Sequence, residues 1–208
     1  TISKLRYSNG SISKLFTVTL PRGSNPKGVA VDSLGNAWVA AGKTSTVYAI
    51  NSSGTIVGTY TGQGINGPWG VSLDAKGNVW VANFGVDLPS SRYSIVQLCG
   101  ATSNCPAGVL MGTAITPDTG YTLPSAGSQV LLNSGQPLYG TGAPPSYLPL
   151  MRLTSVNADM AGNIWAANNW KPSGLNDLLL NPGGDGMVIF IGVAAPTKAP
   201  SLGPAQSP

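Results

Sequence analysis

The chain has 208 residues, of which 42% are hydrophobic and 9% are charged, and its formal net charge is +4. This balance excludes intrinsic disorder, which requires high charge and few apolar residues, and a chain of this length can bury a core. It contains no histidine, and all seven acidic residues are aspartates. Acid–base catalysis usually draws on His or Glu, and zinc sites nearly always use His or Cys, so the composition argues against an enzyme and predicts no metal or cofactor.

The abundance of glycine and proline, with 28 and 17 residues, favours an all-β protein with many turns. The first predicted element is a β-hairpin within residues 1–19, in which Asn9 and Gly10 fit a type I′ turn. Lys4 and Arg6 share one face of its first strand. Charges at such a position protect an exposed sheet edge against aggregation, so we interpret both residues as structural.

Three later segments repeat one pattern, Val-x-x-Asp-x-x-Gly-Asn-x-Trp-x-Ala. They are residues 26–40, 68–82 and 153–167. Their aspartates are first 42 and then 85 residues apart. The first interval is typical of a four-stranded propeller blade, and the second equals one blade plus about one blade length of additional chain.

Each repeated segment predicts two short strands around a tight turn. The aspartate can accept backbone N–H bonds across the turn, and the glycine can adopt a positive φ without steric cost. Because the same residues recur, we interpret them as parts of the blade rather than of a ligand site, with the tryptophans packing between blades. This structural set comprises Asp32, Gly35, Trp38, Asp74, Gly77, Trp80, Asp159, Gly162 and Trp165.

The predicted fold is a single all-β domain, a β-propeller of four-stranded blades that is partial or completed by another chain. The expected boundaries are 1–19 for the outer hairpin of a preceding blade, 20–62, 63–117 and 151–195 for three blades, 118–150 for an insertion and 196–208 for a Pro-rich tail. The insertion lacks the repeat, although a disguised fourth blade is the alternative. Three and a half blades, each a wedge suited to a six-fold ring, leave two open faces. These faces are closed by a disguised blade in residues 118–150, by further parts of a longer protein or by neighbouring chains.

The pattern Pro-x-Gly-Val-x-x-Asp-x-x-Gly-Asn-x-Trp-Val-Ala resembles the blade signature of NHL-repeat propellers and of the related streptogramin (virginiamycin B) lyases. The resemblance is good for residues 20–62 and 63–98 and absent for 118–150. It is partial for 150–195, where Leu153 and Ser155 replace the proline and the glycine. A further stretch, residues 190–204, is similar to the ending of secreted bacterial NHL-type proteins.

This resemblance implies a propeller, of six blades in most members, and functions that range from lyases and hydrolases to binding scaffolds. The lyases of the group depend on histidine. The similar calcium-dependent propeller hydrolases use glutamate among their metal ligands. Since this chain has neither residue, neither activity is carried over to any position of it.

The loops that join the second and third strand of each blade open on the face that commonly carries the ligand, and here they differ from blade to blade, as functional loops do. They span residues 41–46, 83–92 and 168–186. Asparagine offers a donor and an acceptor and tryptophan offers a stacking face, which suits a neutral polar ligand such as a glycan. The candidate binding residues are Trp69, Asn83, Asn168, Asn169, Trp170 and Lys171. In the alternative interpretation, the adjacent asparagines 168 and 169 only satisfy loop backbone groups.

Cys99 and Cys105 are separated by five residues and predict a disulfide, with free thiols as the alternative. A disulfide indicates an oxidising compartment, so we expect a secreted, extracellular or periplasmic protein. Asn9 and Asn51 match the glycosylation sequon, which matters only in a host that glycosylates.

Other partners receive less support. No basic stripe with interleaved aromatic residues is present, so no nucleic acid is expected. The longest apolar run, residues 187–195, is too short to span a bilayer. Asp177 and Asp185 could offer oxygens to calcium, but they lack the spacing of a calcium loop.

The sequence therefore predicts a secreted, NHL-like, non-catalytic binding or scaffold module for a glycan or a protein. Two alternatives remain open. One is a structural subunit of an extracellular assembly, whose open blades are completed by a second copy or a second fragment. The other is a degenerate propeller lyase or hydrolase.

Overall fold

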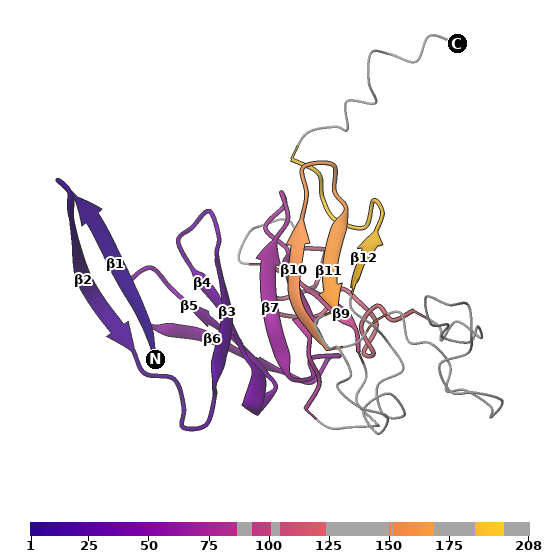
Figure 1. Ribbon diagram of the computed structural model, residues 1–208, viewed down its shortest axis with the longest axis horizontal. Coiled ribbons are helices and arrows are strands. Elements are labelled where there is room, and N and C mark those ends of the chain that lie inside the picture. The colour runs from indigo at the N-terminus through magenta and orange to yellow at the C-terminus, as the bar shows by residue number, and fades with distance from the viewer. Residues whose placement is uncertain (87–92, 101–104, 124–149, 151, 169–185, 198–208) are drawn as a thin grey trace, which may run out of the picture.

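A computed structural model describes residues 1–86, 93–100, 105–123, 150, 152–168 and 186–197. These residues form β-strands and a single 3₁₀ turn, η1 (Gly42–Thr44) (Figure 1). The strands are β1 (Ile2–Ser8), β2 (Ser11–Val18), β3 (Pro26–Val31), β4 (Ala37–Ala41), β5 (Thr46–Ile50), β6 (Ile56–Thr61), β7 (Pro68–Leu73), β8 (Val79–Asn83), β9 (Ile95–Leu98), β10 (Leu153–Ala158), β11 (Ile164–Asn168) and β12 (Gly186–Phe190). None of the described residues forms a helix long and apolar enough to cross a membrane.

The strands form four separate antiparallel sheets, each in simple meander order. The first blade has the four strands β3–β4–β5–β6, the second has β7–β8–β9 and the third has β10–β11–β12. The fourth sheet is the hairpin β1–β2, which stands at one end of the molecule (Figure 1). This arrangement confirms the predicted fold class, an all-β protein built as part of a β-propeller.

The repeated motif forms the turn between the first two strands of each blade. In the first blade, Asp32 Oδ1 accepts the backbone N–H groups of Leu34 and Asn36 at 3.0 and 2.9 Å. Its Oδ2 accepts the Asn36 side-chain amide and the Trp38 indole N–H at 2.9 and 3.1 Å. The aspartate thereby joins the turn to the next strand, and Gly35 takes a φ of 81° at the bend.

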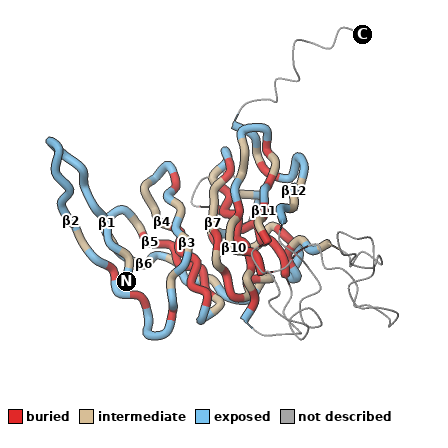
Figure 2. Tube along the Cα trace, in the orientation of Figure 1, coloured by how far each residue is buried: buried red, intermediate tan, exposed pale blue. Residues whose placement is uncertain are grey.

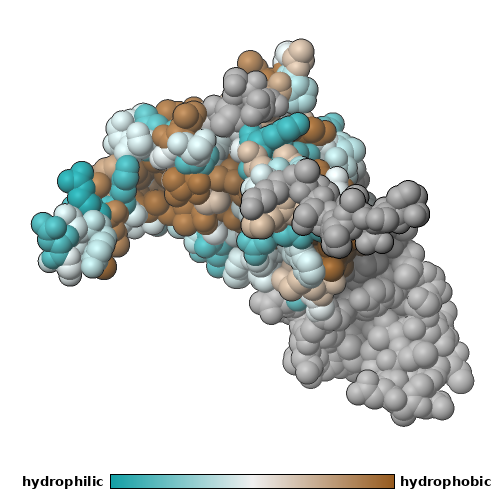
Figure 3. Space-filling view, turned by 90° about the horizontal axis from the view of Figure 1, so that it is seen from above, coloured by the Kyte–Doolittle hydropathy of each residue, from teal (hydrophilic) through white to brown (hydrophobic). Residues whose placement is uncertain are grey.

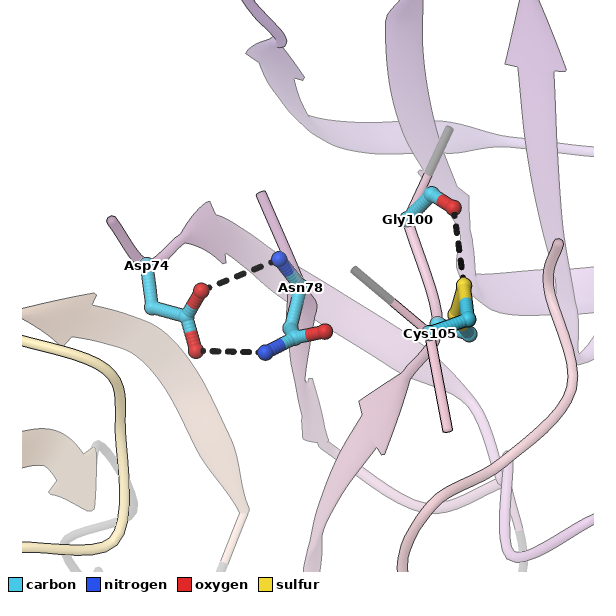
Figure 4. Close-up of a disulfide and its surroundings, with 5 residues drawn as sticks. Asp74, Asn78, Gly100 and Cys105 are labelled. Atoms are coloured by element: carbon cyan, nitrogen blue, oxygen red, sulfur yellow. Dashed lines mark hydrogen bonds between the residues drawn. A yellow bond between two sulfur atoms is a disulfide. The ribbon is translucent and has the colours of Figure 1, made fainter. Parts of the chain in front are cut away.

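The other two turns repeat these bonds. Asp74 Oδ2 accepts the Trp80 indole N–H at 3.1 Å, and Asp159 Oδ2 accepts that of Trp165 at 2.9 Å. Figure 4 shows the carboxylate of Asp74 facing Asn78, which donates to it through both its backbone N–H and its side-chain amide.

The core lies between consecutive blades. Trp38 of the first blade is fully buried against a cluster that includes Val79 and Val81 of the second. Trp80 of the second blade is buried in the same way against Ile164 and Ala166 of the third. The buried residues therefore follow the middle strands of the blades, while most of the hairpin is exposed (Figure 2).

The inner strands β3, β7 and β10 lie side by side (Figure 1). Their close approach depends on glycine: a Cβ at Gly28 would lie 2.6 Å from the carbonyl oxygen of Trp69 in β7. A Cβ at Gly70 would likewise lie 2.9 Å from the Cα of Ser155 in β10. The blades are thus held at a distance that only a residue without a side chain permits.

The predicted disulfide between Cys99 and Cys105 is confirmed. It follows β9, next to the second-blade turn (Figure 4), where a Cβ at Gly100 would overlap the carbonyl oxygen of Gly77. Beyond it the chain returns along β9 and makes bridges from Ala114 to Leu98 and from Tyr121 to Ile95. The disulfide therefore closes the loop that brings this segment to the outer edge of the second blade.

Candidate binding site

A cavity of about 280 Å³ lies at the end of the blades opposite the aspartate turns. It is located where β3 and β7 begin, and the loops after β4 and β8 complete it. Its lining residues are Asn25, Lys27, Gly42, Lys43, Gly67, Trp69, Phe84, Gly85 and Val86. Of the predicted binding residues that the structure describes, Trp69 lines this cavity.

Two aromatic rings form its wall. The ring centroids of Trp69 and Phe84 are 4.5 Å apart, with an angle of 35° between the planes. The Nζ atom of Lys27 lies 4.0 Å from the centroid of the Trp69 ring, which is a close cation–π contact. The positive charge of Lys27 thus lies over the Trp69 ring, which also packs against Phe84.

Arg152 fixes the Phe84 side of the cavity from the third blade. Its buried guanidinium donates from Nη1 to the carbonyl oxygens of Phe84 and Gly85, at 3.3 and 3.1 Å. The same group lies 4.8 Å from the centroid of the Phe84 ring and 5.8 Å from that of Tyr93. Burial raises the pKa of the Tyr93 hydroxyl, and the positive charge of Arg152 opposes part of that rise.

The loops on either side of the cavity are in direct backbone contact. Phe84 N–H donates to the Gly67 carbonyl at 3.0 Å, and Gly85 N–H donates to the Asn66 carbonyl at 3.0 Å. Gly67 has a φ of 54°, and a Cβ there would lie 2.7 Å from the carbonyl carbon of Gly85. The floor of the cavity is therefore held by hydrogen bonds and leaves no room for a side chain at Gly67.

Asn83 supports this floor from below. It is fully buried, its Oδ1 accepts the Asn66 N–H at 3.0 Å, and its Nδ2 donates to the Gly64 carbonyl at 2.7 Å and to Ser94 Oγ at 2.8 Å. These bonds join the end of β8 to the loop before β7 and to the residue before β9. Asn83 is not among the lining residues, so it lies beneath the cavity and fixes its loops.

Of the remaining predicted binding residues, the structure describes Asn168. Asn168 is buried at the end of β11, opposite Leu153 on one side and Gly186 on the other. Asn169, Trp170 and Lys171 fall outside the described residues, as do Asp177 and Asp185. In the part of the chain that the structure describes, no group of three or more His, Cys, Asp or Glu residues could hold a metal ion.

Sequence reasoning missed Lys27, Phe84 and Arg152. A signal for the first was present, because Lys27 and Trp69 occupy the same variable place in the Pro-x-Gly start of two repeats. Their contact follows from the side-by-side inner strands. Arg152 reaches a loop 68 residues earlier in the chain, and no local pattern predicts such a contact.

The sequence matches no protein-family model and no curated protein. Among solved structures, a streptogramin B lyase matches at 17% identity with a TM-score of 0.47, over 91% of this chain and 46% of the other. A virginiamycin B lyase from Staphylococcus aureus matches at 14% identity with a TM-score of 0.40, and the match covers 91% of this chain and 62% of the lyase. The PQQ-bound aldose sugar dehydrogenase of Streptomyces coelicolor matches at 16% identity with a TM-score of 0.36, and the match covers 78% of this chain and 61% of the dehydrogenase.

The chain thus spans about half to under two thirds of the length of these solved chains. At such low identities the likenesses concern the fold alone. They include the lyase group that the blade pattern resembles, whereas membership of the NHL-repeat family is not shown.

Proposed function

We propose that this chain is a non-catalytic, extracellular binding module that holds a polar ligand, with glycans as the favoured class, in the cavity between its first two blades. The observation that carries the proposal is the wall made by Trp69, Phe84 and Lys27. The disulfide supports an extracellular or periplasmic location, since such bonds persist in oxidising compartments.

The chemistry of the wall suits a sugar ring. The apolar C–H face of a sugar packs against an aromatic face, and on Trp69 it would take the place of the Lys27 ammonium. Lys27 and Asn25, which line the cavity, then supply polar groups for hydroxyls. The loops are held in place by Arg152 and Asn83 before any ligand arrives, and such pre-organisation lowers the entropy cost of binding. None of the described lining residues is a carboxylic acid or a histidine, so these residues offer no acid–base pair for glycoside cleavage.

The test is binding of a panel of soluble polysaccharides, such as xylan, laminarin and polygalacturonate, measured by affinity electrophoresis and titration calorimetry. Trp69→Ala should abolish the binding seen with the unchanged protein. Tyr7→Ala removes an exposed aromatic residue from the hairpin, far along the chain from the cavity, and should leave binding intact. Failure of every polysaccharide to bind, or equal binding by the Trp69 variant, would refute the proposal.

A second candidate function is a structural subunit of an extracellular assembly. It is favoured by apolar side chains left exposed on the first blade, Val29 and Val31, and on the third, Met187 and Ile189. Native mass spectrometry tests it, since an assembly would give species heavier than the 21.1 kDa chain. The degenerate lyase or hydrolase alternative finds no supporting arrangement among the described residues.

A further inference from the structure

The two interfaces between consecutive blades are packed in the same way. In the second blade, Val71 and Leu73 of β7 pack towards the buried Trp38 of the blade before it. In the third blade, Val156 of β10 packs towards the buried Trp80 of the second. Each inner strand thus presents apolar side chains to the two-stranded repeat hairpin, with its tryptophan, of the preceding blade.

The first blade has the same side chains but lacks this cover. Val29 and Val31 of β3 stand at the places that Val71 and Leu73 hold in β7, yet 55% and 62% of their surface is exposed. Val39 and Ala41, on the same face of the neighbouring β4, are fully buried under the hairpin β1–β2. The cover therefore ends between β4 and β3.

A groove marks the uncovered part. It has a volume of about 220 Å³, and Val29, Val31 and Ala37 of the first blade form one side. Ile2, Lys4, Phe16 and Val18 of the hairpin form the other side. Figure 3 shows hydrophobic residues gathered in this part of the molecule, next to the hairpin.

The hairpin also has an open edge beside the groove. β1–β2 packs on the first blade as β5–β6 packs on the second. In the first blade, however, β5 is paired on both sides, with β4 and with β6. Among the described residues β1 is paired with β2 alone, so the hydrogen-bonding edge that β5 offers to β4 is unused in β1.

We propose that this groove binds a two-stranded β-hairpin of the same Asp-x-x-Gly-Asn-x-Trp repeat, supplied by polypeptide outside residues 1–208. The second strand of the bound hairpin pairs antiparallel with β1, and its tryptophan faces the side chains of Val29 and Val31. Main-chain bonds to an open edge supply affinity, and the apolar side chains fix the register.

A second copy of this chain does not provide that hairpin. The outer edges of its repeat hairpins are already occupied, because β4 pairs with β5, β8 with β9 and β11 with β12. The interface is instead continuous with the one that the hairpin β1–β2 already makes on Val39 and Ile50. This inference deepens the second candidate function and does not depend on the glycan cavity.

The experiment uses residues 1–208 and a fluorescent peptide with the sequence of residues 68–83, whose ends are joined by a disulfide so that it is a preformed hairpin. We expect saturable binding by fluorescence anisotropy. Val31→Asp should weaken it by about tenfold or more, because the interface would then bury an unpaired carboxylate. A peptide with alanine in place of its second tryptophan should bind as weakly.

Met187→Asp is the matched control, since it puts the same charge at an exposed apolar position of the other open face, 59% exposed. It should leave peptide binding unchanged, and Val31→Asp should leave polysaccharide binding and the melting temperature unchanged. Absence of peptide binding, or equal loss in both variants, would overturn the proposal. Self-association abolished by Val31→Asp, with no effect of peptide, would overturn it in favour of a second copy.

Discussion

The three repeated aspartates make the same local bonds but meet different surroundings. Asp32 and Asp159 accept donors only from their own turn and its tryptophan, as far as the described residues show. Asp74 accepts the same set and, in addition, the N–H of Ala195 at 3.2 Å. One residue of the repeat thus also binds a segment 121 residues away in the chain.

Replacement of Asp74 by alanine tests how much its hydrogen bonds contribute to the stability of the protein. The variant leaves the buried indole N–H of Trp80 and the buried amide of Asn78 without their acceptor. Hydrogen bonds to a charged group contribute about 1.5–3 kcal/mol each, so we expect a loss of roughly 3 kcal/mol or more in unfolding free energy. Urea unfolding followed by tryptophan fluorescence measures it, with the exposed Asp118→Ala as control. Equal midpoints for the two variants would contradict the expectation.

The hydrogen bonds to these aspartates also make the stability of the fold depend on pH. The indole of Trp165, with the backbone and side chain of Asn163, lowers the pKa of Asp159 from 3.8 to about 2. For Asp32, burial raises the pKa, but the bonds from Asn36, Trp38 and Leu34 outweigh it, so the pKa lies below 3.8. A depressed pKa in the folded state means that the stabilisation is present above the unfolded pKa and is lost as the pH falls through the folded one.

We therefore expect the melting temperature to decrease as the pH is lowered from about 4 to about 2, the window set by the unfolded and folded pKa of Asp159. Asp159→Asn should show a smaller decrease across this window, because its side chain does not titrate. Calorimetric scans at closely spaced pH values measure the difference. Parallel curves for the two proteins would show that this carboxylate is not linked to folding.

At the scale of the elements, the distance between blades is set by the inner strands. Gly28 and Gly70 bring β3 to β7 and β7 to β10, where a Cβ would meet backbone atoms. The corresponding residue of the third blade is Ser155. An inner strand beyond β10 could not approach as closely, so the repeat is altered at the third blade's open face.

Gly70→Val should therefore force the second and third blades apart. Overpacking of this kind costs about 1–3 kcal/mol, and the clash is with the backbone of Ser155 and Thr154 rather than with a movable side chain. Ser155→Val places the same side chain at the equivalent position of the third blade and serves as control. Chemical denaturation measures both, and a larger loss in the Ser155 variant would contradict this account of blade spacing.

The disulfide follows the last strand of the second blade. It closes a short loop after β9, from which the chain returns to bridge Leu98 and Ile95. Loop-closure entropy for a ring of this size corresponds to about 2 kcal/mol. We expect the Cys99→Ser, Cys105→Ser double variant to lose about that much stability, measured by urea unfolding. The unchanged protein under reducing conditions should lose the same amount, and a loss seen only on reduction would point to another cause.

How far the sequence predicts these elements depends on whether the contacts are local. The Asp-x-x-Gly-Asn turn and the repeated pattern around it are local, so the all-β fold class could be predicted from them, and the cysteine spacing predicted the disulfide. The bond from each tryptophan to its aspartate was not foreseen, although six residues separate the two. Arg152 could not be foreseen at all, because its role depends on how the second and third blades pack.

At the scale of the whole molecule, consecutive blades are joined by a few long-range polar contacts as well as by their cores. Arg152 of the third blade holds the loop after β8 at one end of the second blade. The segment after β12 contacts the opposite end of the second blade, at its aspartate turn. There Ala195 N–H donates to the Asp74 carboxylate at 3.2 Å, and the Ala195 carbonyl accepts the Ala75 N–H of the second-blade turn at 3.2 Å. Ala194 N–H donates to the Gly162 carbonyl of the third-blade turn at 2.9 Å. The second and third blades are therefore joined by hydrogen bonds at both of their ends.

Ala195→Pro tests the contact between the segment after β12 and the second-blade turn. Proline has no N–H, so the variant loses the donor to Asp74 and keeps the carbonyl that accepts from Ala75. Loss of a hydrogen bond to a charged acceptor should lower the unfolding free energy by about 1.5–3 kcal/mol. Ala195→Ser keeps the N–H and should stay within about 0.5 kcal/mol of the unchanged protein. Hydrogen exchange locates the effect: protection should decrease in the turns of both the second and the third blade, since the segment bonds to both. A decrease confined to residues 192–197 would mean that the segment rests on the blades without joining them.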